Sequence, residues 1–192
     1  YMDVTVFRGG CKYTLHFEKG ENIGGLRREK ADYEHTGTVI RWKPDREVFT
    51  DIDIPLEYYE TVLKKQAVVN SGIRFVLSDE ESGRVSEHCY LNGIVDYIEE
   101  VSGGGGFTGI QHFETSARGR DREDKPDYKV KIQVAFCFSN EASLLEYYHN
   151  SSFLEHGGAP DRAVKIAFVH VIDKFLKTAG KYNKDESKIT FS

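Results

Sequence analysis

A turn–strand–turn unit at residues 36–45 (TGTVIRWKPD) places the strongest local constraint on the fold. A Thr-Gly turn leads into β-branched and aromatic residues, and a Pro-Asp turn ends the run. Further along, a second turn at residues 70–72 (NSG) leads into the strand-like run 73–77. Between the two units, Pro55 can begin a helix, and the residues after it recur at helical spacing: Leu56, Tyr59, Val62, Leu63 and Gln66. The sequence therefore predicts strands and helices that alternate along one chain.

The start of the chain predicts a β-hairpin. Residues 3–8 and 11–17 alternate as strands do, and Gly9-Gly10 forms the turn between them. Residues 18–36 are polar and contain glycines, which indicates a loop. A further turn at 79–83 leads into another strand at 85–90.

The second half has a different character. We expect a short amphipathic helix at 93–101, a flexible glycine-rich break at 102–106 and a charged loop at 117–127. Strands are predicted at 129–139 and 144–148. The clearest helix covers about residues 160–179, with one apolar stripe made of Val164, Phe168, Val171, Ile172, Phe175 and Ala179. Residues 188–192 have the pattern of a strand cut short, and Tyr1 is not a methionine, so the chain is interpreted as an excised piece of a longer protein.

Composition narrows the class of protein. The 192 residues are 39% hydrophobic and 30% charged, which is globular composition, and no apolar run approaches the length of a membrane span. The net charge of −5 argues against a strongly basic surface that coats nucleic acid, although a local basic patch is compatible with it. Three isolated cysteines fit a reducing compartment, so we expect a cytoplasmic protein without a membrane partner.

The chain carries no motif of a self-contained catalytic centre. It lacks HExxH, paired CxxC, GxSxG and the Walker A sequence, so neither a catalytic residue nor a metal ligand is assigned. The glycine run 103–106 is interpreted as a linker rather than a phosphate cradle, because no strand directly precedes it and no helix directly follows. These residues indicate a scaffold or a binding piece.

The order of the turns and strands resembles the DNA gyrase B and topoisomerase IV ATPase subunits, the type IIA topoisomerase family. The matching segments are the hairpin at 4–13, the Thr-Gly-Thr strand and Pro-Asp turn at 36–45, the turn at 70–73, the helix at 93–98, and the strands and Gly-Gly turn at 134–136, 148–150 and 155–158. No single motif is decisive, but their order and spacing together are specific.

The resemblance implies an α+β fold in two parts. Residues 1–90 would be the C-terminal part of a GHKL-type ATPase domain, and residues 91–192 would form a transducer domain that resembles ribosomal protein S5 domain 2 and is truncated at its C-terminus. The parent would be an ATP-hydrolysing DNA topoisomerase, an isomerase that uses ATP and Mg²⁺, acts on DNA, forms a homodimer and partners a DNA-cleaving gyrase A-like subunit. Whether it supercoils or decatenates DNA depends on that partner.

Two residues match nucleotide-site positions of the family. By the resemblance, Thr38 matches the threonine that contacts adenine, partly through water, and its hydroxyl, which can both donate and accept, suits a purine edge; a strand threonine chosen for β propensity is the alternative. Arg8 matches the arginine at the mouth of the pocket where coumarin antibiotics bind; a surface arginine at a strand end is the alternative. The family's phosphate-holding residues would lie upstream of Tyr1 and downstream of Ser192, so the piece alone is expected to be inactive, with no tightly bound cofactor.

Two positions near the Gly-Gly turn depart from the family, and one of them bears on DNA. Ala159-Pro160 replaces the usual Thr-His, and Glu155 stands where an arginine often faces DNA, so an acidic side chain would repel phosphate there. The basic residues of the loop are interleaved with acids, and a solvated loop is favoured over a DNA contact; its charges are Arg118, Arg120, Asp121, Arg122, Glu123, Asp124, Lys125 and Asp127. Two other functions stay open: a stand-alone S5-like nucleic-acid-binding module and a MutL-like GHKL repair protein.

Overall fold

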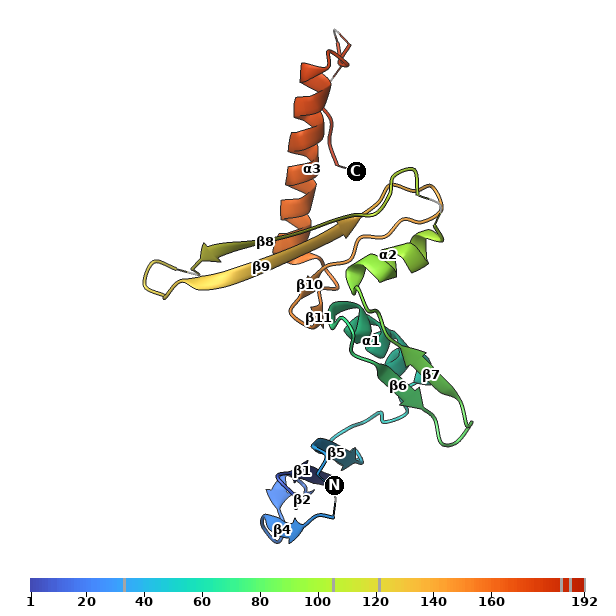
Figure 1. Cartoon of the computed structure of the whole chain (residues 1–192), viewed down its shortest axis with the longest axis vertical. Coiled ribbons are helices and arrows are strands. Elements are labelled where there is room, and N and C mark those ends of the chain that lie inside the picture. The colour runs from blue at the N-terminus through green and yellow to red at the C-terminus, as the bar shows by residue number, and fades with distance from the viewer. Residues whose placement is uncertain (33, 105, 121, 184, 187, 192) are drawn as a thin grey trace. The chain divides into compact units, whose positions relative to one another are not determined.

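The computed structural model describes residues 1–32, 34–104, 106–120, 122–183, 185–186 and 188–191 (Figure 1). The chain divides into two compact units, Tyr1–Pro55 and Leu56–Ser192. Both units mix strands with turns or helices, in agreement with the predicted α+β class.

The unit Tyr1–Pro55 is built on one antiparallel sheet, the N-terminal sheet. Its central strand β1 (Met2–Arg8) pairs with β2 (Cys11–Glu18) on one side and with β5 (Gly37–Trp42) on the other. The other edge of β2 pairs with two short strands, β3 (Glu21–Asn22) and β4 (Arg27–Lys30). The turn between β1 and β2 consists of Gly9 and Gly10, whose φ angles of 58° and 67° lie in the left-handed region that favours glycine.

The register gives this sheet two chemically different faces. Antiparallel partners share a face and alternate residues along a strand change face, so the pairing Val6–Thr38 assigns every position. The first face, called the Thr38 face, is largely apolar and comprises Met2, Val4, Val6, Arg8, Cys11, Tyr13, Leu15, Phe17, Arg28, Lys30, Thr38, Ile40 and Trp42. The second face, called the His16 face, is largely polar and comprises Asp3, Thr5, Phe7, Lys12, Thr14, His16, Glu18, Arg27, Glu29, Gly37, Val39 and Arg41. None of the described residues in this unit is buried.

The unit Leu56–Ser192 begins with its only buried apolar cluster in the described residues. Helix α1 (Leu56–Val69) lies beside the hairpin of β6 (Phe75–Ser78) and β7 (Val85–His88), and helix α2 (Ile94–Ser102) follows. The core is Ala67, Val68 and Tyr90, at 0%, 1% and 7% exposure. Partly buried side chains from α1, β6 and α2 pack against it: Val69, Phe75, Ile94 and Tyr97. The core therefore joins α1 to α2.

The rest of this unit is a long hairpin and a long helix. Strands β8 (Gln111–Gly119) and β9 (Tyr128–Phe136) pair over nine residues each, followed by the small hairpin β10 (Tyr148–His149) and β11 (Ser152–Phe153). Helix α3 (Gly158–Thr178) extends away from the β8–β9 hairpin (Figure 1). The ring of Phe168 meets that of Phe136 edge to face at 5.2 Å. The helix ends where Lys181 N–H donates to the Leu176 carbonyl (2.9 Å) and Gly180 N–H to the Lys177 carbonyl (3.2 Å), the pattern of a Schellman motif.

Several predicted elements differ from the structure. The segment 18–36 is not all loop, because edge strands such as β4 (RREK) pair through their backbone and carry charged side chains. Strand β8 was not predicted at 111–116, and it also takes the first residues of the expected loop 117–127; its sequence offers little apolar alternation. The predicted strand 144–148 reduces to the start of β10, where Tyr148 pairs with Phe153. Residues 144–147 and the described part of 188–192 form no strand.

The apolar stripe predicted on α3 is only half correct. Val164 and Phe168 are partly buried beside the hairpin, but Val171 and Phe175 are each 64% exposed and Ile172 is 39% exposed. The ring of Phe168, near the middle of the helix, contacts Phe136 of β9, while Val171 and Phe175 lie beyond that contact. Gly105, Asp121 and Ser192, which belong to predicted segments, lie outside the described residues. Within the described part of the chain, no helix is long and apolar enough to cross a membrane.

A first prediction concerns Gly93, which precedes α2 with φ 59° and ψ −122°. A Cβ there would meet the Ser71 hydroxyl and would lie 3.1 Å from the Val68 carbonyl oxygen. We expect Gly93→Ala to lower the free energy of unfolding by about 2–4 kcal/mol, because backbone strain and overpacking add. Gly103 is the control: its φ is 58° but its Cβ would meet nothing within 4 Å, so Gly103→Ala should cost about 1–2 kcal/mol. Equal losses in urea unfolding would contradict the packing argument.

A second prediction concerns His16, whose Nδ1 lies 2.7 Å from Asp3 Oδ1 and whose Nε2 lies 3.2 Å from Glu18 Oε1. The hydrogen bonds with Asp3 and Glu18 raise the pKa of His16 above its ordinary value of 6.5. A raised folded-state pKa stabilises the sheet fully below pH 6.5, and the stabilisation is lost as the pH rises through the folded-state pKa. An NMR titration should find this pKa above 6.5 in the wild type and lower in Asp3→Asn. No change in Asp3→Asn would refute the pairing.

Candidate functional site

Thr38 and Arg8 lie on one face of the N-terminal sheet. Thr38 pairs with Val6, and Arg8 stands two residues after Val6 on β1. Alternate residues of a strand share a face, so both side chains project from the Thr38 face as diagonal neighbours, whose Cα atoms are about 7–8 Å apart. Both residues are exposed. The register thus brings together two residues that are far apart in sequence.

The surroundings of Thr38 suit a planar, partly polar ligand. Its neighbours on the same face are apolar: Val4 and Val6 on β1 and Ile40 on β5, which is 58% exposed. A hydroxyl beside a flat apolar surface can donate and accept hydrogen bonds at the edge of a ring that lies on that surface. Arg8 adds a cation at the end of β1, and it forms no ion pair with a described residue.

Two further cations on the Thr38 face were missed from the sequence. Arg28 pairs with Tyr13 and Lys30 pairs with Cys11 in the β2–β4 ladder. Arg28 donates from Nε and Nη2 to Cys11 Sγ at 3.3 and 3.2 Å, and its guanidinium carbon lies 5.9 Å from the Tyr13 ring centroid. The bond with Cys11 raises the pKa of Arg28 above its ordinary value. The only sequence signal for these cations is their spacing: Arg28 and Lys30 are two residues apart, so both would lie on one side if residues 27–30 formed a strand.

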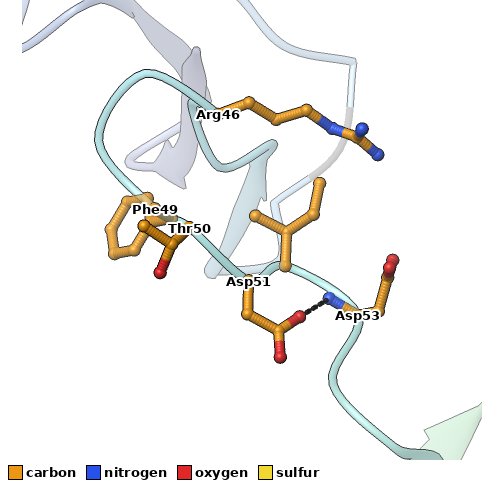
Figure 2. A pocket seen from close by; sticks show the side chains of 6 residues that line it. Arg46, Phe49, Thr50, Asp51 and Asp53 are labelled. Carbon is orange, nitrogen blue, oxygen red and sulfur yellow. Dashed lines mark hydrogen bonds between the residues drawn. The ribbon is translucent and has the colours of Figure 1, made fainter.

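A shallow hollow lies elsewhere in the same unit, in the loop after β5. It is lined by Arg46, Phe49, Thr50, Asp51, Ile52 and Asp53 (Figure 2). The carboxylate of Asp51 accepts from the Asp53 backbone N–H at 3.0 Å, which closes a local turn. Since the hollow is made by one contiguous loop and contains neither Thr38 nor Arg8, it is a feature of the turn rather than a candidate site.

The α1–α2 contact carries charged and aromatic groups around the buried core. Glu100 of α2 accepts from the Tyr90 hydroxyl at 2.6 Å and pairs with Lys64 of α1 at 2.5 Å. These two hydrogen bonds lower the pKa of Glu100 below its ordinary value. Burial, with the nearby Glu100, raises the pKa of Tyr90, and burial with Glu146 raises the pKa of Tyr97 to about 12. Both tyrosines stay neutral at physiological pH, so the cluster is structural in character.

The β8–β9 loop neutralises much of its own charge. Arg120 Nε lies 2.7 Å from Asp127 Oδ1, and Arg122 Nε lies 3.3 Å from Asp124 Oδ1. Arg120 also donates to the Glu123 carbonyl at 3.3 Å. These internal pairs favour the solvated-loop interpretation over a DNA contact.

The Gly-Gly turn before α3 requires glycine at its first position. Gly157 has φ 67°, and a Cβ there would lie 2.6 Å from the Asp161 Cβ. Glu155, two residues earlier, is exposed, so its carboxylate faces solvent where the resembled family often has an arginine.

Across the described residues, no group of three or more His, Cys, Asp or Glu side chains could hold a metal ion.

Comparison with known proteins gives a consistent match. A family model described as DNA gyrase B matches residues 93–192. The gyrase B protein of Staphylococcus epidermidis is 27% identical over 199 aligned residues, covering 98% of this chain and 29% of that protein. The gyrase B protein of Staphylococcus aureus is 28% identical over 185 residues, covering 91% of this chain and 26% of that protein. The chain therefore spans less than a third of the length of these relatives.

A solved structure shares the fold. The 43K ATPase domain of Thermus thermophilus gyrase B, solved in complex with an aminocoumarin, superposes with a TM-score of 0.68 at 23% identity. The match covers 96% of this chain and 49% of that one. Since the family model alone accounts for just over half of the residues, the chain belongs to the DNA gyrase B family.

Proposed function

We propose that this chain is part of the ATP-hydrolysing subunit of a bacterial type II DNA topoisomerase, and that its N-terminal sheet forms one wall of the nucleotide site. The observation that supports this is the register of β1 with β5, which puts Arg8 and Thr38 on one face beside apolar side chains. Thr38 would contact the adenine edge and Arg8 would stand at the pocket mouth. Residues 1–90 would serve the ATPase domain and residues 91–192 the transducer domain.

The rest of the proposal concerns the whole subunit. It would use ATP with Mg²⁺, form a homodimer, act on DNA and work with a gyrase A-like subunit in the cytoplasm. The match of residues 93–192 to the family supports a boundary near residues 90–93. The DNA contact would come from elsewhere than Glu155 or the β8–β9 loop, because the first is acidic and the second pairs its arginines internally.

The adenine role is tested by removing one hydroxyl. In the full-length subunit, Thr38→Val should weaken ATP binding about tenfold, since a lost hydrogen bond that leaves a polar partner unpaired costs about 1–2 kcal/mol. Thr38→Ser keeps the hydroxyl and should bind nearly normally. Thr5→Val is the matched control, because Thr5 pairs with Val39 on the His16 face. If Thr38→Val and Thr5→Val bind ATP equally well by calorimetry, Thr38 does not contact the base.

The chain by itself should not use ATP. Among the described residues, Thr38 would contact the adenine base and Arg8 would stand at the pocket mouth, but no group of His, Cys, Asp or Glu could hold the metal ion that accompanies a triphosphate. Calorimetry on the 192-residue chain should therefore detect no ATP binding at concentrations that saturate the full-length subunit, and no phosphate release should follow. An affinity near that of the full-length subunit would place the phosphate-holding groups inside this chain and overturn the proposed division of the site.

A further inference from the structure

The Thr38 face carries an uncompensated cluster of positive charge. Arg8, Arg28 and Lys30 all project from it, and no aspartate or glutamate of β1, β2, β4 or β5 does. On the His16 face of the same four strands, three cations face three carboxylates: Lys12, Arg27 and Arg41 against Asp3, Glu18 and Glu29. Every residue of these four strands is described, so the difference in charge between the two faces follows directly from the register of the strands.

One member of the cluster, Arg28, is held in place by contacts on the same face. Both hydrogen bonds of Arg28 to Cys11 Sγ are made on the Thr38 face, and the Tyr13 ring lies beside its guanidinium group on that face. A thiol is a weak acceptor without formal charge, so the bond fixes the guanidinium without neutralising it. Neither Arg8 nor Lys30 forms an ion pair with a described residue. The charge of all three groups therefore acts outward from one face.

We propose that Arg28 and Lys30, together with Arg8, steer the anionic nucleotide toward Thr38. This inference rests on the proposed nucleotide site and adds to it two residues and a kinetic role. The strand order β4–β2–β1–β5 separates Arg28 from Thr38 by three strand spacings, about 14 Å. That distance is too long for contact with a base at Thr38, but charges at this range attract a polyphosphate while it approaches.

The distance of about 14 Å between Arg28 and Thr38 also determines how strongly this attraction depends on salt. The Debye length is about 30 Å at 0.01 M ionic strength and about 8 Å at 0.15 M. Attraction from β4 is thus effective at low salt and largely screened at the higher value. A nucleotide is favoured over DNA as the ligand, because the three cations share one small face with Thr38 and do not form an extended track that a duplex backbone would follow.

The test uses the full-length subunit and stopped-flow association of a fluorescent ATP analogue. The double variant Arg28→Ala/Lys30→Ala should lower the association rate constant about threefold or more at low salt and should flatten its salt dependence. The matched control Lys12→Ala/Arg27→Ala removes the same charge from the His16 face and should have a clearly smaller effect. Arg28→Lys keeps the charge while it loses the two bonds to Cys11, and it should associate nearly as fast as the wild type.

Three results would overturn the proposal. Equal slowing in both double variants would indicate a general effect of net charge. No slowing in Arg28→Ala/Lys30→Ala would show that the cluster does not act on the nucleotide. Unchanged ATP association with weakened binding of a DNA duplex would assign the cluster to nucleic acid. Failure of the adenine site is distinguished by a separate measurement, because Thr38→Val would then leave the equilibrium affinity for ATP unchanged.

Discussion

The pairing of β1 with its two neighbours decides the chemistry of the whole N-terminal sheet. Side chains alternate with a period of two, so a slip of one residue in β1 would exchange the two faces. In the observed register, Val6 lies between Tyr13 and Thr38, and the apolar side chains gather with the hydroxyl and the cations. The polar side chains gather on the opposite face, where Asp3 and His16 pair. Nucleotide recognition, as proposed, depends on this one alignment.

The sequence predicted the strongly patterned elements well. The Gly9-Gly10 hairpin, the Thr38 strand, α1, α2 and α3 all appear where alternation, helical spacing and turn residues indicated them. The elements that were missed lack such patterns. Strand β4 consists of four charged residues, and β8 alternates weakly, so both are defined by backbone pairing with a partner that local sequence does not reveal. The exposed end of the apolar stripe on α3 shows a different limit. Periodicity predicts that a helix has an apolar face, but it does not predict which element covers that face.

The residues of the candidate site also divide into those that the sequence indicated and those that only the strand pairing revealed. Thr38 and Arg8 were selected through a family resemblance, and the register then placed them on one face. Arg28 and Lys30 could not be selected, because their relation to Thr38 runs through two intervening strands and three ladders. Their role becomes visible only when each charge is assigned to a face. Membership of the gyrase B family supports the nucleotide interpretation, while the role of the surface charges rests on the register of this sheet.

The contact between α1 and α2 has a mechanical consequence. Val68 and Tyr90 form its buried centre, and Glu100 joins Lys64 to Tyr90 at its edge. Any rotation of one helix against the other would open an apolar core and break an ion pair together, and such losses are cooperative rather than gradual. The two helices are therefore expected to move together as one rigid unit. A bend along this part of the chain would have to occur outside the pair.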